Sequence, residues 1–261
     1  MANIYNQGKN FFCNLVWLSP LMGGILPTAK YLIKARGKPM KLGHGFYNEI
    51  AFKFRNCDTT AIKEVIVDEE YKFLDEFLKN YDEPNIVDVG AHIGTFSLWV
   101  YHRNPRARIL MVEANPASYE ILLHNSGKTF SKEQHQVLNR AAWKNNDTLN
   151  FSTSGDSMGN KVSTNGDTLI DGMTFSEIVD IATQNNSCID LIKIDIEGAE
   201  EAFFETDTST LEKIKRLVIE LHPKYCETSG IIKKLESRYK HVRNISGRID
   251  AKPVLYCTDD Y

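Results

Sequence analysis

The pattern of apolar and polar positions changes near residue 84 of this 261-residue chain. Before that point, short and unlike segments follow one another. After it, apolar runs of strand length alternate with stretches of helical periodicity, which is typical of βαβ units and a mostly parallel sheet. The pattern therefore predicts an α/β fold with a doubly wound, Rossmann-like sheet over residues 85–261. Residues 1–84 are expected to form an N-terminal extension and lead-in elements.

The second part of the chain is expected to contain strands and helices in alternation. The strands are predicted at Asn85–Val89, Arg108–Glu113, Gln136–Ala141, Ile189–Asp195 and Arg216–His222. The helices between them are predicted at Thr95–Tyr101, Pro116–Lys128, Thr174–Gln184 and Gly198–Phe204. The remaining elements are a hairpin over Leu149–Ser163, a helix over Thr228–Tyr239 and strands over Lys240–Ile245 and Pro253–Cys257.

The first part contains an apolar stretch (Phe11–Ile33), an alternating stretch (Glu49–Phe54) and a helical run (Asp68–Asn80) with Asp68 as its N-cap. Prolines, glycines and a lysine interrupt the apolar stretch, so it lacks the roughly 20 consecutive apolar residues of a transmembrane span. It also lacks the pattern of a secretory signal. We expect a short helix and loop packed on the domain. The alternative is an interfacial segment that makes peripheral contact with a membrane or a partner.

The amino-acid composition mainly argues against certain classes of partner and site. The formal charge is −3, with 42% hydrophobic and 25% charged residues, which is ordinary for a globular protein. Such a charge provides no general attraction to phosphate backbones, so we expect no nucleic-acid partner. The five cysteines are scattered and form no C-x-x-C pair, which argues against a zinc site or a disulfide framework and favours a reducing, cytoplasmic compartment. No motif indicates an oligomeric state.

The segment Asn85–Phe96 has the pattern of a buried strand, a Gly-x-x-x-Gly turn and a helix. Sheets of this class bind ligands at such a turn, because helix N-termini and backbone amides are exposed there. The dinucleotide fingerprint fails, since Asp88 and Ile93 stand where its first and third glycines belong. A carboxylate at Asp88 suits a ligand that carries an ammonium and a sulfonium, which is S-adenosylmethionine. Glu113, at the end of the next predicted strand, is expected to accept hydrogen bonds from the ribose hydroxyls.

Several motifs resemble those of the FkbM family of methyltransferases. They are Phe54–Thr59 with Glu70 and Tyr71, Ile86–Ser97, Val112–Pro116, Asp190–Glu200 and Ile219–His222, spread over about residues 50–225. The most specific is the run Lys193-Ile-Asp-Ile-Glu-Gly-Ala-Glu200. The resemblance implies a Rossmann-like methyltransferase fold, S-adenosylmethionine as methyl donor and O-methylation of a sugar, glycan or small metabolite. His92 stands where many members have Asn, and the first 45 residues have no counterpart in the family.

The residues expected to contact the cofactor lie on the glycine turn or at the ends of the predicted strands. They are Asp88, Gly90, Ala91, His92, Gly94, Thr95, Phe96, Glu113, Ala114, Asn115, Ala141 and Asp195. Within this set, Asn115 is expected to reach the adenosine, and the backbone of Ala141 is expected to lie near the adenine.

The predicted catalytic residues are Asp195, Glu197 and His222. Side chains alternate along a strand, so Lys193, Asp195 and Glu197 project together, and Glu220 and His222 meet them from the next strand. An acceptor hydroxyl must lose its proton during methyl transfer, and a base or a metal ion can assist. His222 is the natural candidate for the base. Asp195 is the alternative base, or it contacts the methionine ammonium.

Other interpretations remain open at this stage. A divalent metal ion held by Asp195, Glu197 and His222 is an alternative that we do not favour, because magnesium prefers oxygen ligands and retains waters. We expect Lys193 to form an ion pair with a neighbouring acid. Another class of enzyme, a nicotinamide-dependent oxidoreductase, is disfavoured by the missing glycines. A non-catalytic nucleotide-binding module is disfavoured by the intact acidic cluster.

Overall fold

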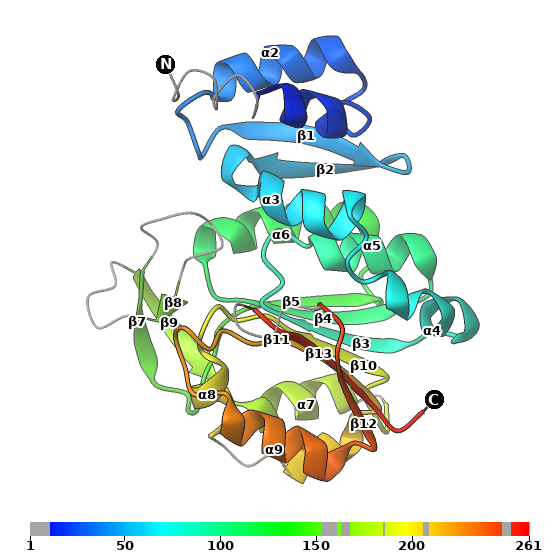
Figure 1. The fold of residues 1–261 in the computed structure, drawn as a ribbon, viewed down its shortest axis with the longest axis vertical. Coiled ribbons are helices and arrows are strands. Elements are labelled where there is room, and N and C mark those ends of the chain that lie inside the picture. The colour runs from blue at the N-terminus through cyan, green and yellow to red at the C-terminus, as the bar shows by residue number, and fades with distance from the viewer. Residues whose placement is uncertain are drawn as a thin grey trace.

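The computed structural model describes residues 11–152, 161–162, 168–184, 186–205, 209–246 and 252–260. Its centre is a seven-stranded sheet in the order β12-β13-β11-β10-β3-β4-β5 (Figure 1). These strands are β3 (Asn85–Val89), β4 (Arg108–Glu113), β5 (His135–Asn139), β10 (Leu191–Ile194), β11 (Arg216–Glu220), β12 (His241–Asn244) and β13 (Val254–Thr258). β13 runs antiparallel to both of its neighbours, β11 and β12, and all other adjacent strands of this sheet are parallel. The predicted doubly wound α/β fold is confirmed.

Helices cover both faces of this sheet (Figure 1). One layer contains α4 (Asp75–Asn80), α5 (Thr95–Arg103) and α6 (Pro116–Thr129); the other contains α7 (Phe175–Thr183), α8 (Glu200–Phe204), α9 (Ser229–Arg238) and the 3-10 helix Ser209–Lys213. Every residue of β3 is buried, and alternate side chains belong to opposite layers: Ile86 packs with α5, whereas Val87 and Val89 pack with α7. Burial on both faces explains why this strand is apolar apart from Asn85 at its start and Asp88.

The N-terminal extension forms a separate layer against α6 at the end of the molecule (Figure 1). Its elements are a helix over residues 11–18, α2 (Ile25–Ala35), the hairpin β1 (Leu42–Tyr47) and β2 (Ile50–Arg55), a 3-10 turn (Asn56–Asp58), α3 (Thr59–Ile62) and a π-helical turn (Lys63–Val67). The backbone amide of Lys53 donates to Asn125 Oδ1 of α6 at 2.8 Å. Leu18, Tyr31 and Leu32 of the two helices are buried in one cluster with Ile93, Leu98 and Ile121. A packed N-terminal helix is therefore confirmed, whereas contact with a membrane or a partner stays a prediction.

Within the residues that the structure describes, no helix combines the length and apolar character needed to cross a membrane. The apolar stretch Phe11–Ile33 is divided between the helix over residues 11–18 and α2, with a turn between them.

Two boundaries differ from the prediction. The run Asp68–Asn80 is not one helix: a 3-10 turn, Lys72–Leu74, precedes α4, and Glu69 has a left-handed φ of 50°, so Asp68 is not an N-cap. The strand predicted at Gln136–Ala141 is divided, because β6 (Ala141–Ala142) leaves the main sheet.

β6 belongs to a second, four-stranded sheet in the order β6-β9-β7-β8. Its other strands are β9 (Thr168–Met173), β7 (Thr148–Ser152) and β8 (Lys161–Val162), and β7 and β8 form the predicted hairpin. The loop over residues 154–160 lies outside the described residues.

Candidate functional site

A cavity of about 400 Å³ lies at the carboxyl ends of β3, β4 and β10, where the sequence predicted the cofactor site. Of the residues predicted to bind the cofactor, those that line it are Gly90, Ala91, His92, Thr95, Phe96, Glu113, Ala114, Ala141 and Asp195. Asp88, Gly94 and Asn115 are not part of its lining. The glycine turn, the end of β4 and the end of β10 are thus brought together around one space.

The glycine turn requires glycine for two structural reasons. Gly90 has φ +77°, and a Cβ atom there would lie 1.7 Å from the carbonyl oxygen of Asp195. The amides of Gly90 and Ala91 both donate to the carbonyl of Val112, at 2.9 and 3.0 Å. Three strand ends therefore approach one another so closely that a side chain at Gly90 does not fit.

Glu113 presents its carboxylate at this turn. Its Oε2 accepts from the amide of His92 at 2.7 Å and its Oε1 from the amide of Asn115 at 2.8 Å, and the residue is only 8% exposed. Burial raises the pKa of Glu113, although these backbone hydrogen bonds oppose the shift. His92 has φ 54°, a conformation that Asn, Asp and His tolerate better than other residues. The histidine at position 92, where many family members have Asn, is therefore compatible with the conformation of the turn.

His92 also joins the turn to the N-terminal extension. Its Nε2 lies 3.1 Å from Oδ1 of Asp58, a fully buried carboxylate that also forms a bidentate pair with Arg55. Arg55 donates in addition to Ser118 Oγ of α6 at 2.8 Å. Although burial opposes it, the close approach of His92 and the pair with Arg55 lower the pKa of Asp58 well below its usual value. The position of the extension is thus coupled to the conformation of the turn.

Asp88 acts behind the turn rather than in the cavity. It is fully buried, accepts from Ser97 Oγ at 2.9 Å and pairs with Lys193 Nζ at 3.3 Å. Lys193 also donates to the carbonyl of Gly90 at 3.0 Å. The expected ion pair of Lys193 is confirmed, with Asp88 as its nearer acidic partner and Asp195 as a more distant one. Asp88 therefore supports the turn, which corrects the expectation that it contacts the cofactor directly.

Asn115 has a different role from the one predicted. Its side chain accepts from the amide of Ala117 at 2.9 Å and caps the N-terminus of α6. Because the carboxamide folds back onto its own helix, it does not line the cavity, and the expected contact with the adenosine does not fit this geometry. The carboxamide of Asn139 instead supports the loop by donating to the carbonyl of Glu113 at 2.8 Å.

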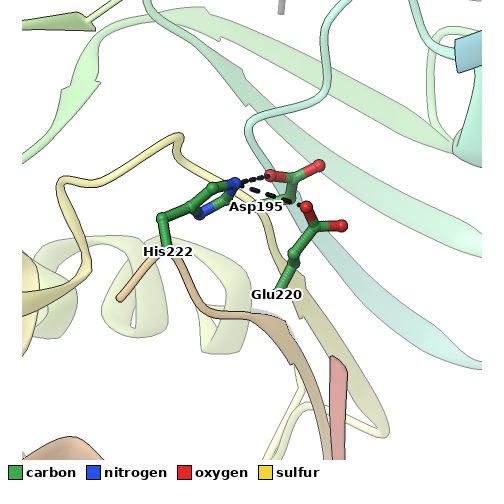
Figure 2. Close-up of side chains that lie close together, drawn as sticks. All are labelled: Asp195, Glu220 and His222. Carbon is green, nitrogen blue, oxygen red and sulfur yellow. Dashed lines mark ion pairs between the residues drawn. The ribbon is translucent and has the colours of Figure 1, made fainter. Parts of the chain in front are cut away.

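The predicted acidic cluster assembles around His222 at the ends of β10 and β11 (Figure 2). His222 Nε2 lies 3.2 Å from Glu197 Oε2, 3.3 Å from Glu220 Oε1 and 3.9 Å from Asp195 Oδ1. Its other ring nitrogen, Nδ1, lies 2.8 Å from Oε1 of the buried Glu200. Asp195, Glu197 and Glu220 line the cavity, whereas His222 lies behind them.

These groups change each other's proton affinity. Burial disfavours an imidazolium, but the surrounding glutamates outweigh it and raise the pKa of His222 to about 12. Burial raises the pKa of Asp195 to about 7, while Lys193 opposes the shift. Without any bound cation, His222 is charged at neutral pH, and an imidazolium has no lone pair with which to accept a proton. This environment does not fit the base role that the sequence suggested for His222.

Sequence reasoning missed two walls of the cavity. The lead-in segment contributes Glu64, Asp68, Glu70 and Tyr71, and the C-terminal part contributes Lys252. Burial, followed by the charge of Glu64, raises the pKa of Glu70 to about 7. Lys252 Nζ lies 3.0 Å from Glu220 and 3.5 Å from Glu197. The sequence did contain an indication of the wall formed by the lead-in segment, since Glu70-Tyr71 is among the motifs that resemble the family. No local sequence pattern, however, predicted that this segment lies over the strand ends.

Comparisons with known proteins agree with the sequence motifs. Residues 88–245 match the family model described as "Methyltransferase FkbM domain". A curated relative, methyltransferase sdnD of Sordaria araneosa, is 48% identical over 42 residues, so the match spans only 16% of this chain and 16% of that protein.

Solved structures that are similar include two methyltransferases. One is magnesium protoporphyrin IX methyltransferase (ChlM) from Synechocystis PCC 6803 with bound SAM, at 13% identity and a TM-score of 0.47, covering 88% of this chain and 94% of that chain. The other is precorrin-6y C5,15-methyltransferase from Geobacter metallireducens GS-15, at 13% identity and a TM-score of 0.42, covering 76% and 92%.

Proposed function

This chain belongs to the FkbM methyltransferase family, and we propose that it transfers a methyl group from S-adenosylmethionine to a hydroxyl oxygen of a sugar, glycan or small metabolite. The observation that carries the proposal is the carboxylate of Glu113, held by two backbone amides at the wall of the cavity beside the glycine turn. An ionised carboxylate accepts hydrogen bonds and donates none, so it suits the two ribose hydroxyls of the cofactor.

The charges around the cavity support a cationic cofactor over a dinucleotide. More carboxylates than cationic side chains line it: Glu64, Asp68, Glu70, Glu113, Asp195, Glu197 and Glu220, against Arg140, Lys193 and Lys252. A pyrophosphate would be repelled by this excess of carboxylates, whereas a sulfonium and an ammonium are attracted. The volume of about 400 Å³ also falls within the roughly 300–1,000 Å³ of ordinary ligand pockets.

The acceptor is proposed to bind beside Asp195, Glu197 and Glu220. In the transfer, the acceptor oxygen forms a bond to the methyl carbon, the carbon–sulfur bond breaks, and its electron pair stays on sulfur. The hydroxyl proton passes to a carboxylate in the cavity wall. Asp195 is the proposed acceptor of that proton, because it lines the cavity at the end of β10, beside the glycine turn. Glu197 and His222 then position this carboxylate cluster.

Calorimetric titration tests the cofactor. Purified protein is titrated with S-adenosylmethionine and, separately, with NADH, and the wild type is compared with Glu113→Ala. We expect micromolar binding of S-adenosylmethionine that the substitution weakens, and no binding of NADH. Preference for NADH, or S-adenosylmethionine affinity that is unchanged in Glu113→Ala, would contradict the proposal. The acceptor class is tested by supplying sugars and small hydroxylated metabolites and measuring release of S-adenosylhomocysteine.

A further inference from the structure

The Nε2 atom of His222 lies among carboxylates but forms no regular hydrogen bond. His222 is 1% exposed, and among the described residues neither Nε2 nor the buried Oδ1 of Asp195 has a hydrogen-bond partner of acceptable geometry. Figure 2 shows the carboxylates of Asp195 and Glu220 directed toward this nitrogen. Because they approach one another without hydrogen-bond alignment, these atoms are available to a shared centre other than a proton on Nε2.

The spacing of the atoms fits a bound cation. Divalent cations bind nitrogen and oxygen at about 2.1 Å, so neighbouring octahedral ligand atoms lie about 3 Å apart and opposite ones about 4 Å apart. From His222 Nε2, the observed separations are 3.3 Å to Glu220 Oε1 and 3.9 Å to Asp195 Oδ1. All three ligand atoms lie within 4.8 Å of one another. Only small side-chain adjustments are needed to close them around one ion.

Glu200 orients the ring for this purpose. Its fully buried carboxylate accepts from Nδ1 of His222 at 2.8 Å and is itself fixed by the amide of Gly198 at 3.0 Å. An Nδ1–H that donates to a carboxylate leaves the lone pair of Nε2 directed to the other side of the ring. Histidines that bind metals are commonly held in this way, by a carboxylate on the second nitrogen.

The charge of the cluster also calls for a cation. Four carboxylates contact or approach His222: Asp195, Glu197, Glu200 and Glu220. Lys252 pairs with two of them, and Lys193 Nζ lies 3.3 Å from Asp88 and, farther away, 3.9 Å from Asp195. A singly charged imidazolium and one lysine leave this partly buried group negative, and uncompensated buried charge is costly. A divalent ion reduces that cost more than a proton does.

We propose that Asp195, Glu220 and His222 form a binding site for a divalent cation of the Mn²⁺ or Mg²⁺ type, with Glu197 beside it. Mixed carboxylate and imidazole ligands suit Mn²⁺ better than Mg²⁺, which prefers oxygen alone. The metal site that we did not favour from the sequence had Asp195, Glu197 and His222 as ligands. In the proposed site, Glu220 takes the place of Glu197. The bound ion would take Oδ1 of Asp195 and leave Oδ2 for the proton of the acceptor.

The position of the site indicates its use. Asp195 and Glu220 line the cavity and His222 lies behind them, so the remaining coordination positions face the acceptor. An acceptor with two neighbouring oxygens, such as a vicinal diol or a hydroxy acid, fits such an ion. This preference rests on the proposed function, whereas binding of the ion does not.

Binding is measured with Mn²⁺ by electron paramagnetic resonance, because bound Mn²⁺ loses the sharp six-line signal of the free ion. The full chain is titrated with Mn²⁺ in the absence of S-adenosylmethionine. We expect one equivalent to be bound and Mg²⁺ to displace it at higher concentration. Failure of the wild type to bind stoichiometric Mn²⁺ would overturn the proposal.

Three variants test the assignment of ligands. Glu220→Gln removes one ligand and is expected to weaken Mn²⁺ binding about 10- to 100-fold. Lys252→Gln removes a competing positive charge and is expected to tighten binding several-fold. Glu205→Gln alters an exposed carboxylate paired with Lys144 and should leave binding unchanged. Equal affinity in Glu220→Gln and the wild type, or weaker affinity in Lys252→Gln, would contradict the site.

The two proposals fail in different ways. Loss of Mn²⁺ binding with intact calorimetric binding of S-adenosylmethionine would refute the cation site alone. Intact Mn²⁺ binding in a protein that does not bind S-adenosylmethionine would refute the proposed cofactor and leave the cation site standing. Because Lys252→Gln is expected to bind more tightly, a variant that merely unfolds does not imitate the predicted pattern.

Discussion

Replacing Gly90 by alanine tests whether the close approach of β3 and β10 builds the cofactor site. The added Cβ would lie 1.7 Å from the carbonyl oxygen of Asp195, whereas real Cβ atoms essentially never approach within 3.0 Å. The two strand ends must therefore separate by more than about 1 Å. Such a shift strains the hydrogen bond from the amide of Asp195 to the carbonyl of Val89, which is 3.0 Å long.

Three contributions make up the expected cost in free energy of unfolding. A left-handed φ costs an alanine about 1–2 kcal/mol, and the weakened backbone hydrogen bond adds about 1 kcal/mol. With the disturbed packing at the strand ends, we expect Gly90→Ala to lower the free energy of unfolding by about 3 kcal/mol. Affinity for S-adenosylmethionine should fall at least tenfold, because the turn and Asp195 move apart at the cavity wall.

Gly94→Ala is the matched control. Gly94 has a similar φ of +85°, but a Cβ there would meet only the terminal Cδ1 of Leu122, at 2.8 Å, and Gly94 does not line the cavity. Its cost should be the backbone strain alone, about 1–2 kcal/mol, with little change in cofactor affinity. Urea unfolding and calorimetry measure both quantities. If Gly90→Ala is no more harmful than Gly94→Ala in either assay, the close-approach argument is wrong.

Three further predictions follow from the contacts of the site. Glu113→Gln should reduce S-adenosylmethionine affinity about 10- to 100-fold in calorimetry, because hydrogen bonds to a charged group contribute roughly 1.5–3 kcal/mol; a change below threefold would contradict its ribose role. Asp195→Asn should lower kcat at least about 100-fold while cofactor affinity stays within a few-fold, as measured by S-adenosylhomocysteine release and calorimetry; unchanged turnover would exclude Asp195 as proton acceptor. Asp58→Asn should lower the free energy of unfolding by about 3 kcal/mol at neutral pH, since it breaks a buried pair with Arg55. Because the pKa of Asp58 is lowered in the folded state, its contribution is present above the ordinary carboxyl pKa of about 4 and is lost as the pH falls below it. The difference between wild type and Asp58→Asn in urea unfolding should therefore narrow from pH 6 to pH 3, and a constant difference would refute the linkage.

The sequence by itself determined the architecture and the location of the crevice. Strand periodicity and glycine placement are local properties, so the apolar run before Gly90 and the alternation that follows it were sufficient to predict a parallel sheet. Side-chain alternation on a strand also predicted correctly that Asp195 and Glu197 meet Glu220 and His222, because parallel strands end at one edge. The position of Glu113 at the next strand end followed from the same argument.

Only the tertiary structure decided the burial, the charged neighbours and the hydrogen-bond partners of these residues. His222 resembled a free base in the sequence, yet Glu197 and Glu200 from one segment and Glu220 from another surround it and keep it charged. Asn115 was expected in the cavity, but the start of α6 takes its side chain as a cap. The link from Asp58 to His92 joins residues far apart in the chain. Burial and electrostatic environment depend on distant segments that pack together, and local sequence patterns carry no information about those distances.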